Sequence, residues 1–145
     1  MILKKKAQLS FEFILLFSLM MLIFIIAGTI LISALEHNKQ IESQAGYIAK
    51  EIKSSAILAS LSESDFHTNV TIPSTIAGQG IYVDIHKTPD NLVVIKQLYT
   101  GSIYRVIAQE FLPNIDADGV NLENLNNVTI IIGKVGTNMT IKLAN

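Results

Sequence analysis

The residues with the strongest chemical signal lie at the N-terminal edge of the longest apolar stretch in the chain. Glu12 is a single carboxylate placed directly before an uncharged run from Phe13 to Leu35, and three lysines at 4–6 precede it. A carboxylate can pair with a cation, but an ionised side chain at the edge of a membrane segment is costly to keep. Such a residue is by default a candidate for a functional site.

The uncharged run has the length of a membrane-spanning helix. Its 23 residues suffice, at about 1.5 Å per residue, to cross a hydrocarbon layer about 30 Å thick. The lysines mark the cytoplasmic side, so the sequence predicts a membrane location with the remainder of the chain outside the cell. An ordinary cleaved signal peptide is disfavoured, because the apolar run exceeds the usual length and Ile32 stands where a cut after Ala34 needs a small residue.

The composition excludes several classes of protein. The sequence contains no cysteine, so neither a disulfide framework nor a thiolate zinc site stabilises the part of the chain that follows the apolar run. The formal net charge is −1 with eleven basic and twelve acidic residues; without the three lysines at 4–6, eight against twelve leaves −4. An acidic exterior argues against nucleic acid as a partner.

The apolar run continues into an amphipathic stretch without a break. No proline occurs before Pro73, and beyond Glu36 the apolar residues recur every three or four positions, which is typical of one helix face. We expect one helix over residues 8–62, with 8–35 as the apolar half, 36–62 as the amphipathic half, and a break at Ser62–Asp65. The expected apolar face consists of Ile41, Ala45, Ile48, Ile52, Ala56 and Ala59.

The remainder, residues 63–145, changes to the period-2 pattern of strands. Alternating or continuous apolar segments separated by turn residues predict an antiparallel meander and a further hairpin. The expected strands are 69–72, 81–85, 92–98, 103–108, 128–132 and 139–143. A small sheet needs a cover for its apolar face, and the amphipathic helix supplies one. The sequence therefore predicts an α+β fold, in which a long N-terminal helix packs on a small antiparallel β-sheet head.

The string from Lys6 to Phe13, KAQLSFEF, resembles the class III signal peptide of archaeal type IV pilin-like proteins. In that family a basic leader and a small residue precede a glutamine, followed by a serine two positions on and a glutamate four positions on. Ser10 and Glu12 match those positions. The resemblance implies that residues 1–7 are a leader and that a prepilin peptidase cuts between Ala7 and Gln8. Ala7 replaces the glycine often found there, but it keeps a small side chain.

The resemblance also implies a function and partners. The mature chain is expected to assemble through its N-terminal helix, as a homo-oligomer, into an extracellular type IV-like adhesion filament. Its partners would be the peptidase, an assembly platform and an ATPase, with the membrane holding the precursor. Glu12 lies one helical turn from Gln8 and would pair with the N-terminal amine of a neighbouring subunit. The alternative for Glu12 is an interaction with its own helix dipole, worth about 0.3–1 kcal/mol.

Other candidate sites carry weaker signals. Three sequons predict N-glycosylation, at Asn69, Asn127 and Asn138. The loop that contains Asn114, Asp116 and Asp118 resembles half of a calcium loop, but Leu125 stands where the bidentate glutamate belongs, so a plain turn is favoured.

The sequence predicts neither an enzyme nor a cofactor. It holds no nucleophile motif and no phosphate-binding glycine loop, and its three histidines, His37, His67 and His86, are isolated. Two alternatives to a main filament subunit remain. The chain could be a permanently membrane-anchored extracellular binding module, or a minor pilin that primes or tips a filament.

Overall fold

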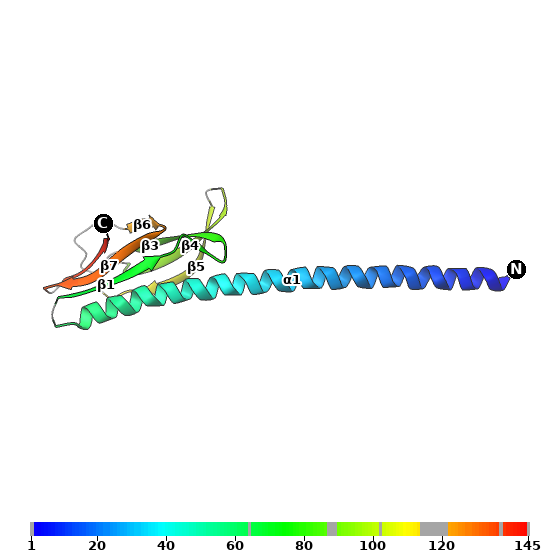
Figure 1. Cartoon of the computed structure of the whole chain (residues 1–145), viewed down its shortest axis with the longest axis horizontal. Coiled ribbons are helices and arrows are strands. Elements are labelled where there is room, and N and C mark those ends of the chain that lie inside the picture. The colour runs from blue at the N-terminus through cyan, green and yellow to red at the C-terminus, as the bar shows by residue number, and fades with distance from the viewer. Residues whose placement is uncertain are drawn as a thin grey trace. The chain divides into compact units, whose positions relative to one another are not determined.

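A computed structural model describes residues 2–63, 65–86, 90–101, 103–113, 122–136 and 138–144; the side chains of residues 2–10, 99, 100, 135 and 138 are outside this description. The described chain begins with a helix, and strands follow it (Figure 1). The chain divides into two units, Met1–Lys39 and Gln40–Asn145. The elements are α1 (Ile2–Leu61), β1 (Phe66–Ile72), β2 (Thr75–Ile76), β3 (Gln79–His86), β4 (Leu92–Thr100), β5 (Ile103–Phe111), β6 (Leu122–Leu125), β7 (Val128–Val135) and β8 (Asn138–Leu143).

Helix α1 ends where the sequence predicts and begins earlier. It stops at Leu61, directly before the predicted break at Ser62, and the Ser62 N–H still donates to the Leu58 carbonyl at 3.1 Å. At the other end it begins at Ile2 and not at residue 8. Residues 2–7 contain only good helix formers and no glycine or proline, so the helix continues through the lysines.

The core of the second unit lies between α1 and the strands. All six residues of the predicted helix face are buried, and Ala49 and Ser55 extend that face. Opposite them lie the apolar side chains of the strands, of which the fully buried large ones are Val70, Ile72, Ile81, Val83, Val93, Ile95, Ile130 and Ile132. The amphipathic half of α1 therefore covers the strands as predicted, and the α+β fold is confirmed.

The first sheet has three antiparallel strands in the order β1-β7-β8. The β7–β8 hairpin is as predicted, and β1 forms one edge of this sheet. Register pairs Asn69 with Ile131 and Thr71 with Thr129 across β1 and β7. Gly133 of β7 lies so close to β1 that an added β-carbon would be 2.7 Å from the carbonyl oxygen of Phe66. The close approach of the two strands thus requires glycine at this position.

The second sheet has five antiparallel strands, in the order β2-β3-β4-β5 with β6 also paired to β3. The meander of β3, β4 and β5 is as predicted, whereas the division into two sheets and the strands β2 and β6 are not. A tight turn joins β2 to β3, with positive φ angles of 48° at Ala77 and 78° at Gly78. Strands this short carry too little periodic pattern to be recognised from sequence.

Candidate functional site

The apolar part of α1 exposes nearly every large side chain it carries. The exposed fractions of these side chains range from 48 % at Met21 to 72 % at Phe13. The exposed set comprises Phe11, Phe13–Phe17, Leu19–Ile26, Ile30–Ile32 and Leu35. In the part of the chain that the structure describes, α1 is the helix long and apolar enough to cross a membrane. So large an exposed apolar surface needs a covering of lipid or of other protein.

Two hydroxyls of this segment bond to carbonyls of the same helix. The Ser18 hydroxyl donates to the Ile14 carbonyl at 2.8 Å, and the Thr29 hydroxyl donates to the Ile26 carbonyl at the same distance. Hydroxyls that bond to their own helix need no partner from the surroundings. Ser18 and Thr29 can therefore enter either lipid or a bundle of apolar helices with their hydroxyls paired.

The predicted processing and assembly residues lie on the first turns of α1. Glu12 is exposed, and the helical backbone places it one turn after Gln8, on the same side of the helix. Lys6, Ala7 and Ser10 belong to the same helical backbone, but their side chains lie outside the description. The backbone of α1 therefore holds Gln8 and Glu12 one helical turn apart, as the predicted role of Glu12 requires.

Two ion pairs join α1 to strand β5. Arg105 Nη2 lies 2.8 Å from Glu42 Oε1, and Lys53 Nζ lies 2.8 Å from Glu110 Oε2. The hydrogen bond from Lys53 is the main cause that lowers the pKa of Glu110. Burial opposes it, and the charges of Lys53 and Lys50 lower the pKa by smaller amounts. The ion pairs fix which stretch of the helix faces β5.

A lysine side chain of the three-stranded sheet contacts the C-terminal end of α1. Lys134 of β7 donates to the carbonyl oxygens of Ser60 at 3.2 Å and of Ser62 at 2.5 Å. The last carbonyls of a helix lack partners within the helix and carry partial negative charge. Lys134 therefore stabilises the helix end and ties it to the three-stranded sheet.

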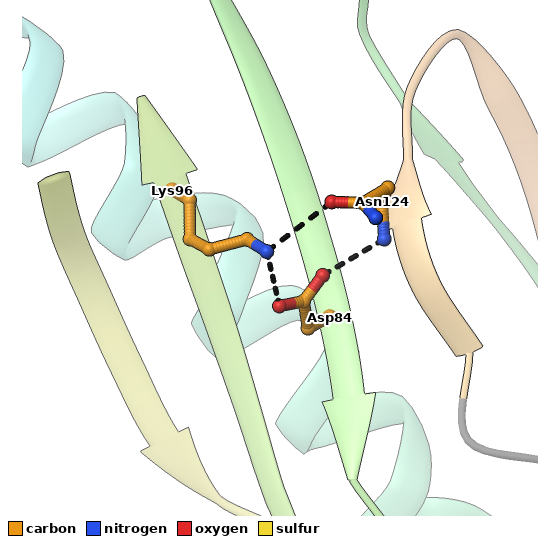
Figure 2. A network of polar contacts seen from close by, with 3 residues as sticks. All are labelled: Asp84, Lys96 and Asn124. Atoms are coloured by element: carbon orange, nitrogen blue, oxygen red, sulfur yellow. Dashed lines mark hydrogen bonds and ion pairs between the residues drawn. The ribbon is translucent and has the colours of Figure 1, made fainter. Parts of the chain in front are cut away.

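A polar network holds β6 against the five-stranded sheet (Figure 2). Asp84 is 7 % exposed, accepts a hydrogen bond from the Asn124 backbone N–H at 2.8 Å, and pairs with Lys96 at 2.5 Å. Lys96 also donates to Asn124 Oδ1 at 3.3 Å and lies 4.9 Å from the ring centre of Tyr104. Each of these polar groups thus has a partner, so the network orders β3, β4 and β6.

The structure describes the side chains of two of the three predicted glycosylation residues. Asn69 is exposed in β1, and Asn127 is exposed directly before β7 at a φ of 52°. The hydroxyls of their sequon threonines, Thr71 and Thr129, lie 3.3 Å apart. Asn138 begins β8, and its side chain lies outside the description. The two described asparagines are therefore accessible to a modifying enzyme.

The remaining candidates do not come together in one place. The loop with Asn114, Asp116 and Asp118 lies outside the described residues. Among the described residues, no three His, Cys, Asp or Glu side chains gather as metal ligands would. His67 lines a shallow hollow of about 360 Å³ on the three-stranded sheet together with Asn69 and Lys142. That hollow is open to solvent and contains no arrangement of nucleophile and base.

The amino-acid sequence did not predict the ion pairs between helix α1 and strand β5. The partners in the two ion pairs are 63 and 57 residues apart, and no local pattern links them. Comparison of the chain with protein-family models, with curated proteins and with solved structures finds no match. The functional interpretation therefore depends on the residues and their geometry.

Proposed function

We propose that this chain is the precursor of a pilin-like structural subunit, which a prepilin peptidase cuts before Gln8 and which assembles through α1 into an extracellular filament. The observation that carries the proposal is the apolar segment of α1, whose side chains are exposed along its whole length. Two surroundings suit such a segment: lipid before assembly, and the same segments of other copies afterwards.

Moving the apolar segment from lipid into a bundle of such segments changes its hydrophobic free energy very little. Lipid tails are as apolar as leucine, so packing and polar contacts decide whether helices leave lipid for one another. The lysines at 4–6 oppose this exchange, because each costs about 2.5–3.5 kcal/mol at the centre of an apolar layer on the insertion scale. Cutting after Ala7 removes all three and leaves a new amine on Gln8, within one helical turn of Glu12.

The geometry of the second unit suits a subunit that projects from such a bundle. Its strands pack on the amphipathic half of α1, and polar ties hold the helix at Glu42, Lys53 and the carbonyls near Ser60. The head is therefore built on the continuation of the helix that would form the filament core. Accessible Asn69 and Asn127 suit a glycosylated surface outside the cell.

The test is the mass of the N-terminus in filaments sheared from cells that make the chain. The proposal expects many copies per filament, each beginning at Gln8 or at its cyclised form. A chain that keeps Met1–Ala7 and stays in the membrane fraction would instead indicate a permanently anchored binding module. A cut chain present in only a few copies per filament would indicate a minor pilin.

A further inference from the structure

The predicted glycosylation residue Asn69 lines the hollow on the three-stranded sheet. Val70 and Ile72 of β1 are buried in the core, so the side chains that alternate with them, including that of Asn69, lie on the opposite face of the sheet. The hollow on this face has a volume of about 360 Å³, and side chains of all three strands line it: His67, Asn69, Ile131, Thr140, Lys142 and Leu143. A group attached to the Asn69 amide therefore begins inside or beside this hollow.

The strand register places Lys142 across the hollow from Asn69. Asn69 pairs with Ile131 of β7, and Ile131 pairs with Lys142 of β8. Because neighbouring strands lie about 4.8 Å apart, the backbones of Asn69 and Lys142 are about 10 Å apart. Both of these residues are exposed, whereas Ile131 between them is half-buried. A ring linked to Asn69 can thus lie over Ile131 and reach Lys142.

The next row of the register borders the hollow on one side. His67 pairs with Gly133, and Gly133 pairs with Thr140. A β-carbon at Gly133 would collide with the His67 imidazole, so the ring lies over β7 in space that a side chain would otherwise fill. The Thr140 hydroxyl donates to the Gly133 carbonyl at 3.5 Å. Glycine at 133 therefore lets His67 and Thr140 border the hollow without a side chain between them.

The chemistry of the lining suits a sugar ring. A pyranose has an apolar face of C–H groups and carries hydroxyls around its rim. Ile131 and Leu143 offer apolar surface to such a face, and the Lys142 ammonium and the Thr140 hydroxyl offer hydrogen bonds to the rim. Among the described residues, no carboxylate forms an ion pair with Lys142, so its ammonium can donate to a ligand.

We propose that Asn69 carries an N-linked glycan whose first sugar ring lies in this hollow, over Ile131 and against Lys142. The donor is a glycosyl phosphate. The Asn69 amide nitrogen forms a bond to the anomeric carbon, the bond from that carbon to the phosphate oxygen breaks, and the amide loses one proton to solvent. This inference rests on the part of the proposed function that puts the second unit outside the cell, and not on cleavage or filament formation.

The test uses two matched variants. The hydroxyls of Thr71 and Thr129 lie 3.3 Å apart, so Thr71→Val and Thr129→Val lose the same interaction. Thr71→Val removes the sequon of Asn69, whereas Thr129→Val removes that of Asn127, which does not line the hollow. Asn69→Gln, which keeps both threonines, should behave like Thr71→Val.

The measurement is the rate at which an amine-reactive ester labels each lysine of the full chain. The chain is purified in detergent micelles from the cells that make it, and peptide mass spectrometry reads both the labelling and the sugar on each asparagine. Lys142 should react at least threefold more slowly in the unchanged chain and in Thr129→Val than in Thr71→Val. Lys50, which is exposed on α1 and does not line the hollow, should react equally in all of them.

Equal labelling of Lys142 in all chains, with a sugar present on Asn69, would overturn the contact. Slower labelling of Lys142 and Lys50 together would show general shielding by the glycan and would overturn it too. An Asn69 without sugar in the unchanged chain would overturn the attachment. The same spectra give the first residue of the chain, so retention of Met1 would contradict the proposed cleavage and leave the result at Asn69 intact.

Discussion

At the scale of single residues, Glu12 is the side chain on which the proposed assembly would most depend. It is an exposed acid at the start of an apolar segment, one helical turn after Gln8. Burying it inside a bundle of helices without a cation would leave an uncompensated charge, which is strongly destabilising. In the proposed filament the amine of a neighbouring Gln8 supplies that cation and so fixes the axial position at which each copy docks.

Glu12→Ala should abolish this pairing and reduce the yield of sheared filaments severalfold or more, while the head stays folded and cleavage proceeds. The matched control is Glu36→Ala, which removes the acid at the other end of the same apolar run and should leave the filament yield near normal. The measurement is the amount of chain in sheared filaments relative to the membrane. A normal yield from Glu12→Ala would contradict the docking role.

Glu110 gives a second prediction at this scale, which concerns stability against pH. Its pKa is lowered in the folded chain, chiefly by the hydrogen bond from Lys53. A carboxyl with a lowered folded-state pKa stabilises the fold above its ordinary value of 4.5, and this contribution is lost as the pH falls from there through the folded-state value. Glu110→Gln should therefore flatten the decline in stability below about pH 4.5.

The measurement for Glu110 is urea unfolding of the full chain in detergent micelles at several pH values, followed by the circular dichroism of the tyrosines. Lys53→Met removes the donor of the same hydrogen bond, so the double variant should lose less than the sum of the two single losses. Additive losses in the free energy of unfolding would show that the interaction between Lys53 and Glu110 does not stabilise the fold.

At the scale of elements, α1 contributes two different surfaces to the molecule. From Phe11 to Leu35 it exposes apolar side chains around its whole circumference, and from Ile41 it buries one face against the strands. Small and branched side chains alternate along that face, with Ala45, Ala49 and Ala56 at full burial. The small residues let the sheets approach the helix closely, and the isoleucines between them fill the core.

Ile52→Ala should test how much of the stability of the head depends on this face. Ile52 is fully buried, so the substitution should lower the free energy of unfolding by about 2–5 kcal/mol. Ile57→Ala is the control on the same helix, because Ile57 is 39 % exposed and should cost much less. Both are measured by urea unfolding of the full chain in micelles. Equal losses would mean that α1 does not cover the sheets by this face.

At the scale of the whole molecule, the two units require different surroundings. Among the described side chains of the unit up to Lys39, which begin at Phe11, none is buried, and the apolar ones suit a covering of lipid or of other helices. The unit from Gln40 has a core between helix and sheets. In the proposed function, a leader with three lysines holds the first unit in the membrane, and its removal would turn the membrane-held precursor into a filament subunit.

Ala7→Leu should block that step, because a large side chain at the predicted cleavage site does not fit a peptidase that accepts small residues there. The full-length precursor should accumulate in the membrane, and filaments should be absent. Ala7→Gly keeps a small side chain and should be cut normally. Immunoblots of membrane and sheared fractions measure both forms. Filaments built from uncut Ala7→Leu chains would show that cleavage is not required for assembly.

Features that repeat along the chain at short range could be predicted from the amino-acid sequence. The uncharged run and the spacing from Ile41 to Ala59 recur within a few residues, so the long helix, its buried face and its end near Ser62 could be predicted. The meander of β3, β4 and β5 could be predicted for the same reason, since its strands alternate visibly and are joined by short turns.

Only the tertiary structure decided which distant residues meet. The division into two sheets, the pairing of β6 with β3, and the ties of Arg105 to Glu42 and of Lys53 to Glu110 join positions tens of residues apart. Strand partners and ion pairs are selected by the packing of the whole core, and a local pattern carries no record of that packing.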